Sequence, residues 1–168
     1  MRILQTALEL FSKEGFHATS TNKVAKQAGV SEGLVFKHFG NKSGLLDAVL
    51  KEGEKRFLSL YSSIITEEDP KQALKKTLVM PFDVKVSEYE FWKLQFKLKW
   101  EMNISGSEKM APVKEKLVTV FTELGYAFPE MEAENIILLI EGISGALLKG
   151  DLPDKAGYKN YLLTKYEV

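Results

Sequence analysis

The sequence predicts an all-α fold, with an N-terminal three-helix head, a long fourth helix and an antiparallel helical body. Three observations predict this class. Apolar residues recur every three or four positions along most of the 168 residues, as on one face of a helix. Ser, Asn or Asp precedes several of these runs, where each can cap a helix N-terminus. Between residues 19 and 42, two short helical patterns flank a tight turn at Ala28-Gly29-Val30.

The first three predicted helices make up the head. The first runs from about Ile3 to Glu14, and Gly15 is a natural C-terminal stop. Its apolar stripe consists of Ile3, Leu4, Ala7, Leu8 and Phe11. Ser20 or Thr21 is expected to cap the second helix, and Ser31 the third. Gly29 supplies the positive φ that a sharp turn between two helices requires.

The fourth helix is expected to connect the head to the body. Asn41 is its cap, and the apolar pattern continues from Lys42 to Ile65. At ~1.5 Å per residue such a helix is ~36 Å long. We therefore predict a head at residues 1–46 and a body at residues 47–168.

The body contains further helices with clear boundaries. Asp69-Pro70 begins one helix, which Pro81 ends. After a polar loop at residues 104–109, the remaining helices are predicted at residues 112–124, 129–149 and 158–166. Residues 87–103 are ambiguous because apolar and polar side chains alternate there, which is a strand period. A single strand would have no partner strand, so we favour a helix whose lysine stems extend outward from a buried surface.

Composition restricts the protein's chemistry. There is no cysteine, so disulfides and thiolate metal sites are excluded. The longest apolar run, residues 136–140, is far below the ~20 residues of a membrane span. Because the N-terminus also lacks a signal-peptide layout, we expect a cytoplasmic protein without a membrane partner. The net charge is zero, but residues 1–57 carry nine Lys/Arg and six Asp/Glu, so the head is modestly basic.

Catalytic motifs are missing from the sequence. It contains no nucleophile elbow and no phosphate-binding glycine loop. His17 and His38 are 21 positions apart and form no metal-binding pattern. We therefore expect no enzyme activity, no metal and no cofactor.

The segment from Thr19 to Lys42 has the layout of a helix-turn-helix. A chain with two short helices around a tight turn offers the second helix to the major groove of DNA. Four lysines and one acidic residue lie in this segment, which suits a phosphate-facing surface.

The residues from Ile3 to Leu50 closely resemble the N-terminal domain of the TetR-type, or tetracycline-repressor-like, bacterial transcription regulators. The landmarks of this resemblance are Ala7, Leu8, Leu10, Phe11, Gly15, Phe16, Thr19, Ser20, Thr21, Val24, Ala25, Ala28, Gly29, Val30, Ser31, Gly33, Phe36, His38, Phe39, Lys42, Leu45 and Leu46. Beyond the head, only the number of helices is compatible with the family.

The resemblance implies that the third helix reads DNA. The expected DNA-binding residues are Thr21, Lys23, Ser31, Gly33, Leu34, Phe36, Lys37, His38 and Lys42. Phe36 stands where the family usually has a phosphate-binding tyrosine, and Leu34 replaces a usual small or hydroxylated residue. Phe36 could instead be a core residue. His38 could be a proton-gated phosphate contact or a neutral surface histidine.

Aromatic side chains concentrate in the middle of the body. As a set they favour an apolar ligand pocket, and the family typically binds a small-molecule inducer in this domain. The candidate ligand-binding residues are Phe82, Tyr89, Trp92, Phe96, Trp100 and Phe121. The alternative for each residue is an ordinary place in the helical core.

The helix at residues 129–149 carries a strip of small residues, Gly142, Gly145 and Ala146. Two glycines in one helix cost roughly 1 kcal/mol each, which suggests close approach of another helix. The resemblance implies pairing of two subunits through the last two helices. The candidate dimer-interface residues are Ile137, Glu141, Gly142, Gly145, Ala146, Tyr158 and Leu162. Tight packing within one chain is the alternative.

Together these features predict a homodimeric TetR-type regulator, which we expect to act as a repressor. It would bind double-stranded operator DNA with palindromic half-sites and would be released by a small apolar or amphipathic effector. The alternative is a helical small-molecule-binding protein whose head no longer binds DNA specifically.

Overall fold

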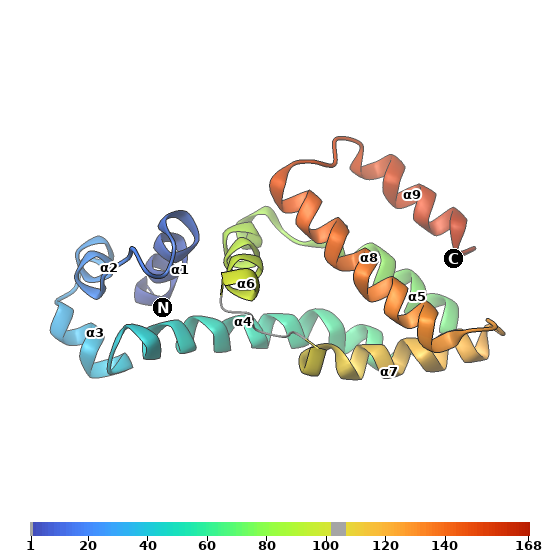
Figure 1. Cartoon of the computed structure of the whole chain (residues 1–168), viewed down its shortest axis with the longest axis horizontal. Helices are drawn as coiled ribbons and strands as arrows, with labels where there is room; N and C mark the ends of the chain where they lie inside the picture. The colour runs from blue at the N-terminus through green and yellow to red at the C-terminus, as the bar shows by residue number, and fades with distance from the viewer. Residues whose placement is uncertain (1, 102–106) are drawn as a thin grey trace. The chain divides into compact units, whose positions relative to one another are not determined.

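The computed structural model describes residues 2–101 and 107–168 (Figure 1). Within these ranges the regular structure is helical, which confirms the predicted all-α class. The helices are α1 (Arg2–Glu14), α2 (Thr21–Ala28), α3 (Glu32–Phe39), α4 (Lys42–Ile65), α5 (Pro70–Val79), α6 (Tyr89–Glu101), α7 (Ser107–Glu123), α8 (Pro129–Lys149) and α9 (Lys155–Lys165). Short 3-10 turns, η1 (Met80–Asp83) and η2 (Val86–Glu88), lie between α5 and α6.

The chain divides into two compact units. The first comprises residues 1–57 and 87–104, and the second comprises residues 58–86 and 105–168. The head predicted at residues 1–46 lies within the first unit. By packing, α6 also belongs to this unit, because Phe91 and Leu94 join its core. This packing division differs from the boundary predicted after residue 46, which was drawn from the end of the helix-turn-helix pattern.

The core of the first unit is built by α1 to α4 and α6. Its buried residues are Ala7, Leu8, Leu10, Phe11, Val24, Ala25, Val35, Leu45, Leu46, Val49, Phe91 and Leu94. Helix α1 packs against α2 and α6. The apolar stripe predicted for residues 3–14 thus contributes much of the core that holds the helix-turn-helix.

In the second unit, α7 and α8 pack against one another, and α5 contacts α7 and α9. Phe121, Leu117 and Ile136 are fully buried between these helices. A smaller cluster joins α8 to α9 through Ile143, Leu147 and Leu162. In the described ranges, no helix has the length and apolar character that crossing a membrane would require.

The caps predicted from sequence are present at several helix starts. The Ser20 hydroxyl accepts the Lys23 N–H at 3.1 Å, so Ser20 rather than Thr21 caps α2. Ser31 caps α3. Asn41 Oδ1 accepts the N–H of Gly44 at 2.9 Å, and Asp69 caps α5. The helical interpretation of residues 87–103 is confirmed for α6, which starts at Tyr89.

Two predicted helix starts were wrong. Helix α7 begins at Ser107, so Pro112 lies inside it rather than at its first position. Proline keeps a helical φ but lacks an N–H, so an early turn of the helix tolerates it at the loss of one backbone hydrogen bond. Helix α9 begins at Lys155 instead of Tyr158, because Asp154 accepts the N–H of Gly157 at 2.8 Å and caps it.

Candidate nucleic-acid interface and ligand pocket

The angle between α2 and α3 is fixed by a buried face and a glycine turn. Val24, Ala25 and Val35 are almost completely buried. Gly29 adopts φ +66°, a left-handed conformation that favours glycine. The N–H of Val30 then donates to the carbonyl of Ala25 at 3.0 Å and ends α2. This geometry leaves the opposite face of α3 uncovered.

The uncovered face of α3 is partly apolar and partly basic. Phe36 is 46% exposed and Leu34 is 36% exposed, whereas Val35 between them is buried. Lys37 and His38 are also exposed. A Cβ atom on Gly33 would meet nothing within 4 Å, so another backbone can approach there. The interpretation of Phe36 as a core residue was wrong, because its ring lies on the outer surface of the helix.

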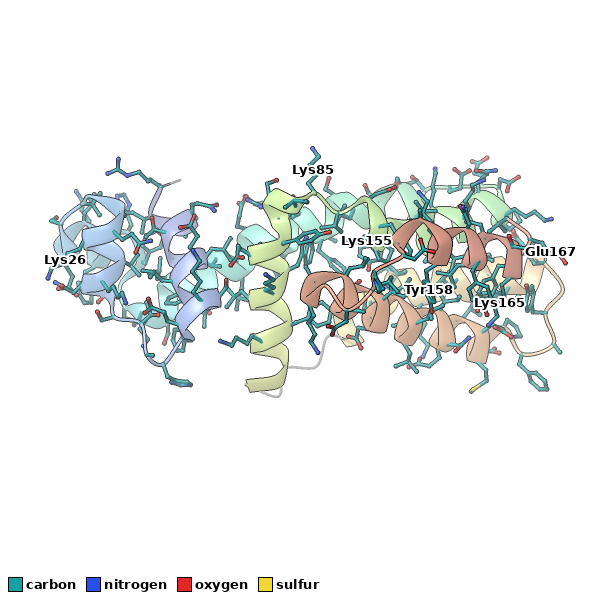
Figure 2. All side chains as sticks on the ribbon, turned by 90° about the horizontal axis from the view of Figure 1, so that it is seen from above. Lys26, Lys85, Lys155, Tyr158, Lys165 and Glu167 are labelled. Atoms are coloured by element: carbon teal, nitrogen blue, oxygen red, sulfur yellow. The ribbon has the colours of Figure 1, made fainter. Side chains whose placement is uncertain are left out.

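Thr21 and Asn22, in the first turn of α2, are held by an acidic residue of α3. The Thr21 hydroxyl donates to Glu32 Oε1 at 2.7 Å, and the Asn22 side-chain amide donates to Glu32 Oε2 at 3.1 Å. The hydrogen bond from Thr21 and then that from Asn22 lower the pKa of Glu32, with a smaller contribution from Lys26. Figure 2 labels Lys26 on α2. Glu32 is therefore a carboxylate on the face predicted to meet phosphates.

Two of the predicted DNA-contacting lysines have partners within the chain. Lys23 Nζ lies 2.7 Å from Glu14 Oε2. Lys42 Nζ donates to the carbonyl of His17 at 3.1 Å and lies 4.6 Å from the centre of the Phe16 ring. In contrast, Lys37 has no ion pair or hydrogen bond with another residue in the described ranges. It is the cation of α3 that is free for an external anion.

Sequence reasoning missed Glu32, Asn22 and Glu14. A partial signal was available, because Glu32 is the single acidic residue between Thr19 and Lys42. Its pairing with Thr21 across the turn depends on the angle between α2 and α3. That angle is a tertiary property, so the spacing along the chain did not reveal the pair.

The six aromatic residues predicted to bind a ligand do not belong to one compact unit. Tyr89, Trp92 and Phe96 lie in the first unit, and Phe82 and Phe121 lie in the second. The side chain of Trp100 lies outside the described residues. Phe121 is fully buried in the helical core, as its alternative interpretation held. The indole N–H of Trp92 is buried without a hydrogen-bond partner, next to the rings of Phe57 and Phe91.

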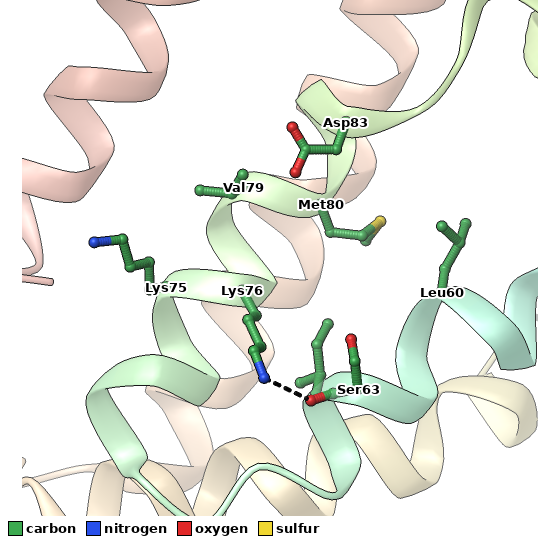
Figure 3. Close-up of a pocket in the computed structure, with 8 residues that line it drawn as sticks. Leu60, Ser63, Lys75, Lys76, Val79, Met80 and Asp83 are labelled. Atoms are coloured by element: carbon green, nitrogen blue, oxygen red, sulfur yellow. Dashed lines mark hydrogen bonds between the residues drawn. The ribbon is translucent and has the colours of Figure 1, made fainter.

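A pocket in the second unit is lined by residues that the sequence did not single out (Figure 3). It has a volume of about 370 Å³. The lining residues are Leu60, Ser63, Ile64, Lys75, Lys76, Val79, Met80 and Asp83. A helical spacing could have found them, since Lys75, Val79 and Asp83 follow one another at four-residue intervals.

The two lysines of this pocket differ in their surroundings. Lys76 Nζ lies 2.5 Å from Glu67 Oε2 and 3.4 Å from the carbonyl oxygen of Ser63. Lys75 has no ion pair or hydrogen bond with another residue that the structure describes. An anionic group that entered this pocket would therefore meet the ammonium group of Lys75, together with the carboxylate of Asp83 in the same lining.

The residues predicted for a dimer interface fall into two groups. On α8, Gly142 is exposed, and Ile137, Glu141, Gly145 and Ala146 are half-buried. On α9, Tyr158 is half-buried, but Leu162 is buried within the chain against Ile143 and Leu147. Leu162 thus has little surface left to offer a partner. Leu138, which the prediction did not include, is 59% exposed and lies four residues before Gly142.

A helix-turn-helix with an uncovered second helix defines a class of DNA-binding protein. Residues 3–49 match the family described as "Bacterial regulatory proteins, tetR family". Residues 3–49 therefore resemble the N-terminal domain of this family, and the match does not extend to the rest of the chain. The matched family is described as one of regulatory proteins, the class that the sequence predicted from the head.

Curated relatives match only part of this chain. The "Fatty acid metabolism regulator protein" of Bacillus subtilis is 34% identical over 68 residues, which cover 40% of this chain and 35% of the relative. The chain thus matches about a third of the length of such curated relatives.

Two solved structures share the fold over almost the whole chain. A proposed transcriptional regulator from Saccharomonospora viridis, solved with choline, has a TM-score of 0.78 at 17% identity, covering 98% of this chain and 93% of its own. FadR from Bacillus subtilis, solved with stearoyl-CoA, has a TM-score of 0.69 at 21% identity, covering 99% and 96%. At these identities the similarity establishes the fold.

Proposed function

We propose that the protein is a ligand-responsive transcription regulator, acting as a repressor, that binds a palindromic operator as a dimer. The observation that carries the proposal is the outer face of α3. Leu34 and Phe36 are exposed there, Lys37 has no partner among the residues that the structure describes, and the space beside Gly33 is open. An apolar side chain can contact a thymine methyl group, and a lysine can bind guanine or phosphate. Two such heads would read half-sites about 34–36 Å apart.

The proposed release from DNA depends on an effector in the second unit. The pocket of Figure 3 combines the apolar side chains of Leu60, Ile64 and Val79 with the free ammonium group of Lys75. This combination suits a small amphipathic molecule with an anionic group. The stearoyl-CoA in the FadR structure is also amphipathic and anionic, although it is much larger. The effector must bind the DNA-free state more tightly than the DNA-bound state to cause release.

The DNA-binding proposal is tested by selection of bound fragments from genomic DNA, followed by fluorescence anisotropy on the selected site. Lys37→Ala and Lys42→Ala should both weaken binding. Each should also reduce the slope of log K against log[salt] by roughly 0.9, as expected for one lost phosphate contact. Unchanged affinity and slope in both variants would reject α3 as the DNA-reading helix.

The effector proposal is tested by titrating the protein with decanoate and with decyltrimethylammonium, which have matched chains and opposite charges. Decanoate should bind more tightly, and Lys75→Ala should remove this preference. Lys71→Ala is the matched control, because Lys71 lies on the same helix outside the pocket lining. If both variants lost the preference for decanoate equally, a binding site at Lys75 would be contradicted.

A second candidate function is a small-molecule-binding protein whose head no longer binds DNA specifically. It is favoured by Phe36, which has no hydroxyl group for a phosphate, and by the internal pairing of Lys23 and Lys42. Failure to retain the protein on nonspecific duplex DNA at low salt would support this candidate.

A further inference from the structure

The face of the head that is predicted to meet DNA carries two carboxylates. Each accepts a hydrogen bond from a residue that is predicted to bind DNA. Glu32 accepts from Thr21 at 2.7 Å and from Asn22 at 3.1 Å. Glu14 holds Lys23, with both of its oxygens 2.7 Å from Nζ. Thr21 and Lys23 are both among the residues predicted to bind DNA, and both lie in the first turn of α2.

A carboxylate and a phosphate compete for the same donors. Both are oxygen anions, and both form short, charge-assisted hydrogen bonds with hydroxyl, amide and ammonium groups. The Thr21 hydroxyl has one proton to donate. It cannot serve Glu32 and a DNA phosphate at the same time.

We propose that Glu32, assisted by Glu14, occupies in the free protein the donors that DNA phosphates occupy in the complex. Binding then proceeds by exchange of carboxylate for phosphate at Thr21, Asn22 and Lys23. The proposal rests on the proposed function, because it presupposes that this face binds DNA. In this proposal, Glu32 lowers the affinity of the head for DNA without contacting a base.

Glu32 is not needed to hold α2 and α3 together. Val24, Ala25 and Val35 already bury the contact between these helices, whereas Glu32 lies at their solvent-facing edge. Its hydrogen bonds keep the pKa of the Glu32 carboxyl below the ordinary value, so the competing anion is fully charged at neutral pH. Lys26, nearby on α2, adds to this effect.

The exchange has a consequence for DNA selectivity. Every duplex offers phosphates, so the loss of the carboxylate contacts weakens binding to all sequences alike. A correct operator adds base contacts at Leu34 and Lys37, which offset that loss. The carboxylates therefore suppress nonspecific binding more than they lower the final occupancy of the operator.

The first test compares Glu32→Gln with Glu9→Gln on a duplex of random sequence at low salt. Both variants remove one negative charge from the head. Glu9 lies on α1 and, among the described residues, its side chain accepts a hydrogen bond from Gln5 alone. Glu32→Gln should raise affinity by roughly 3- to 10-fold, the range expected for about one net hydrogen bond. Glu9→Gln should change it by less than about 2-fold. A folded Glu32→Gln protein with unchanged or weaker affinity would overturn the proposal.

A second measurement separates exchange from a purely structural role. The side-chain carboxyl signal of Glu32 can be titrated by NMR with and without the same duplex. Exchange predicts that the pKa of Glu32 rises in the complex, because its donors leave and phosphates approach. An unchanged pKa on DNA binding would refute the exchange even if affinity changed.

The outcomes distinguish the two proposals. If the wild-type protein binds DNA but Glu32→Gln shows no gain, the exchange fails and the proposed function stands. If the wild-type protein does not bind while Glu32→Gln does, the exchange is supported directly. If neither binds at low salt, the proposed function fails and the exchange fails with it.

Discussion

The ring of Phe91 in α6 lies where a Cβ atom on residue 53 of α4 would have to be, so these helices touch through Gly53. Phe91 is 1% exposed and belongs to the core of the first unit. Arg56, one turn along α4, lies 5.5 Å above the same ring and pairs with Glu88 just before α6. The missing side chain at residue 53 is therefore what allows α6 to pack with α1 and the first part of α4.

This contact predicts the effect of Gly53→Ala. The added methyl group must displace Phe91 from a filled core, which should lower the free energy of unfolding by about 1–3 kcal/mol. Gly33→Ala is the matched control, since it is also a helical glycine in the same unit but has open space around it. The control should be neutral or stabilising by up to about 1 kcal/mol. Urea unfolding measures both, and equal stability of the two variants would contradict the packing.

The exposed ring of Phe36 predicts a gain of function. Phe36→Tyr places a hydroxyl group at the edge of α3, where the tetR-family resemblance implies a phosphate contact. One added hydrogen bond of about 0.5–1.5 kcal/mol corresponds to roughly a 2- to 10-fold tighter complex with DNA. Anisotropy titrations of the wild-type and Phe36→Tyr proteins would measure it. Weaker binding by a folded Phe36→Tyr protein would place the ring away from the phosphate backbone.

The exposed strip on α8 predicts a defined dimer. Gly142 has open space around it within the chain, so Gly142→Glu should not disturb the fold of one subunit. It should nevertheless separate subunits that pair through this face, because it would bury a charge between two helices. Light scattering at micromolar concentration should give a dimer for the wild-type protein and a monomer for the variant. Val86→Glu, at a residue that is 77% exposed outside α8 and α9, should remain dimeric.

The pair between Glu67 and Lys76 predicts a pH dependence of stability. The hydrogen bond from Lys76, followed by that from the backbone N–H of Asp69, lowers the pKa of Glu67 below 4.5. A lowered pKa in the folded state means that the pair stabilises the protein above pH 4.5. This stabilisation is lost as the pH falls through the lower, folded-state value.

In Lys76→Met, the free energy of unfolding should therefore fall less steeply as the pH is lowered than it does in the wild-type protein. Lys75→Met is the control, since Lys75 has no carboxylate partner in the described part of the chain. Urea unfolding between pH 3 and pH 7 would compare the three proteins. Coincident profiles for the wild-type and Lys76→Met proteins would contradict the assignment of this pair.

Local sequence features predicted the helices of the head well. Caps and turns act over three or four residues, so Ser20, Ser31, Asn41 and Gly29 could be recognised from their neighbours alone. The same reasoning gave wrong starts for α7 and α9. Pro112 was interpreted as the first residue of a helix, because proline is common at that position. Asp154 was not recognised as the cap of α9.

The residues of the candidate sites were harder to predict from the sequence. The aromatic residues chosen for a ligand pocket proved to be distributed between two compact units, with Phe121 in the core. An aromatic side chain has the same preference for a core and for an apolar pocket, so its identity cannot separate the two. The pocket beside Lys75 could not be predicted from the sequence, because it depends on the relative positions of α4 and α5 within the second unit.

By itself, the sequence determined the all-α class, the helix-turn-helix and the resemblance of the head to a regulator family, because each depends on patterns within a few turns of helix. Only the tertiary structure decided which polar groups pair. It placed Glu32 on Thr21, Glu14 on Lys23 and Phe91 against Gly53, contacts that span 9 to 38 positions of the chain. Such contacts depend on the angles at which helices pack, and no local pattern of residues encodes those angles.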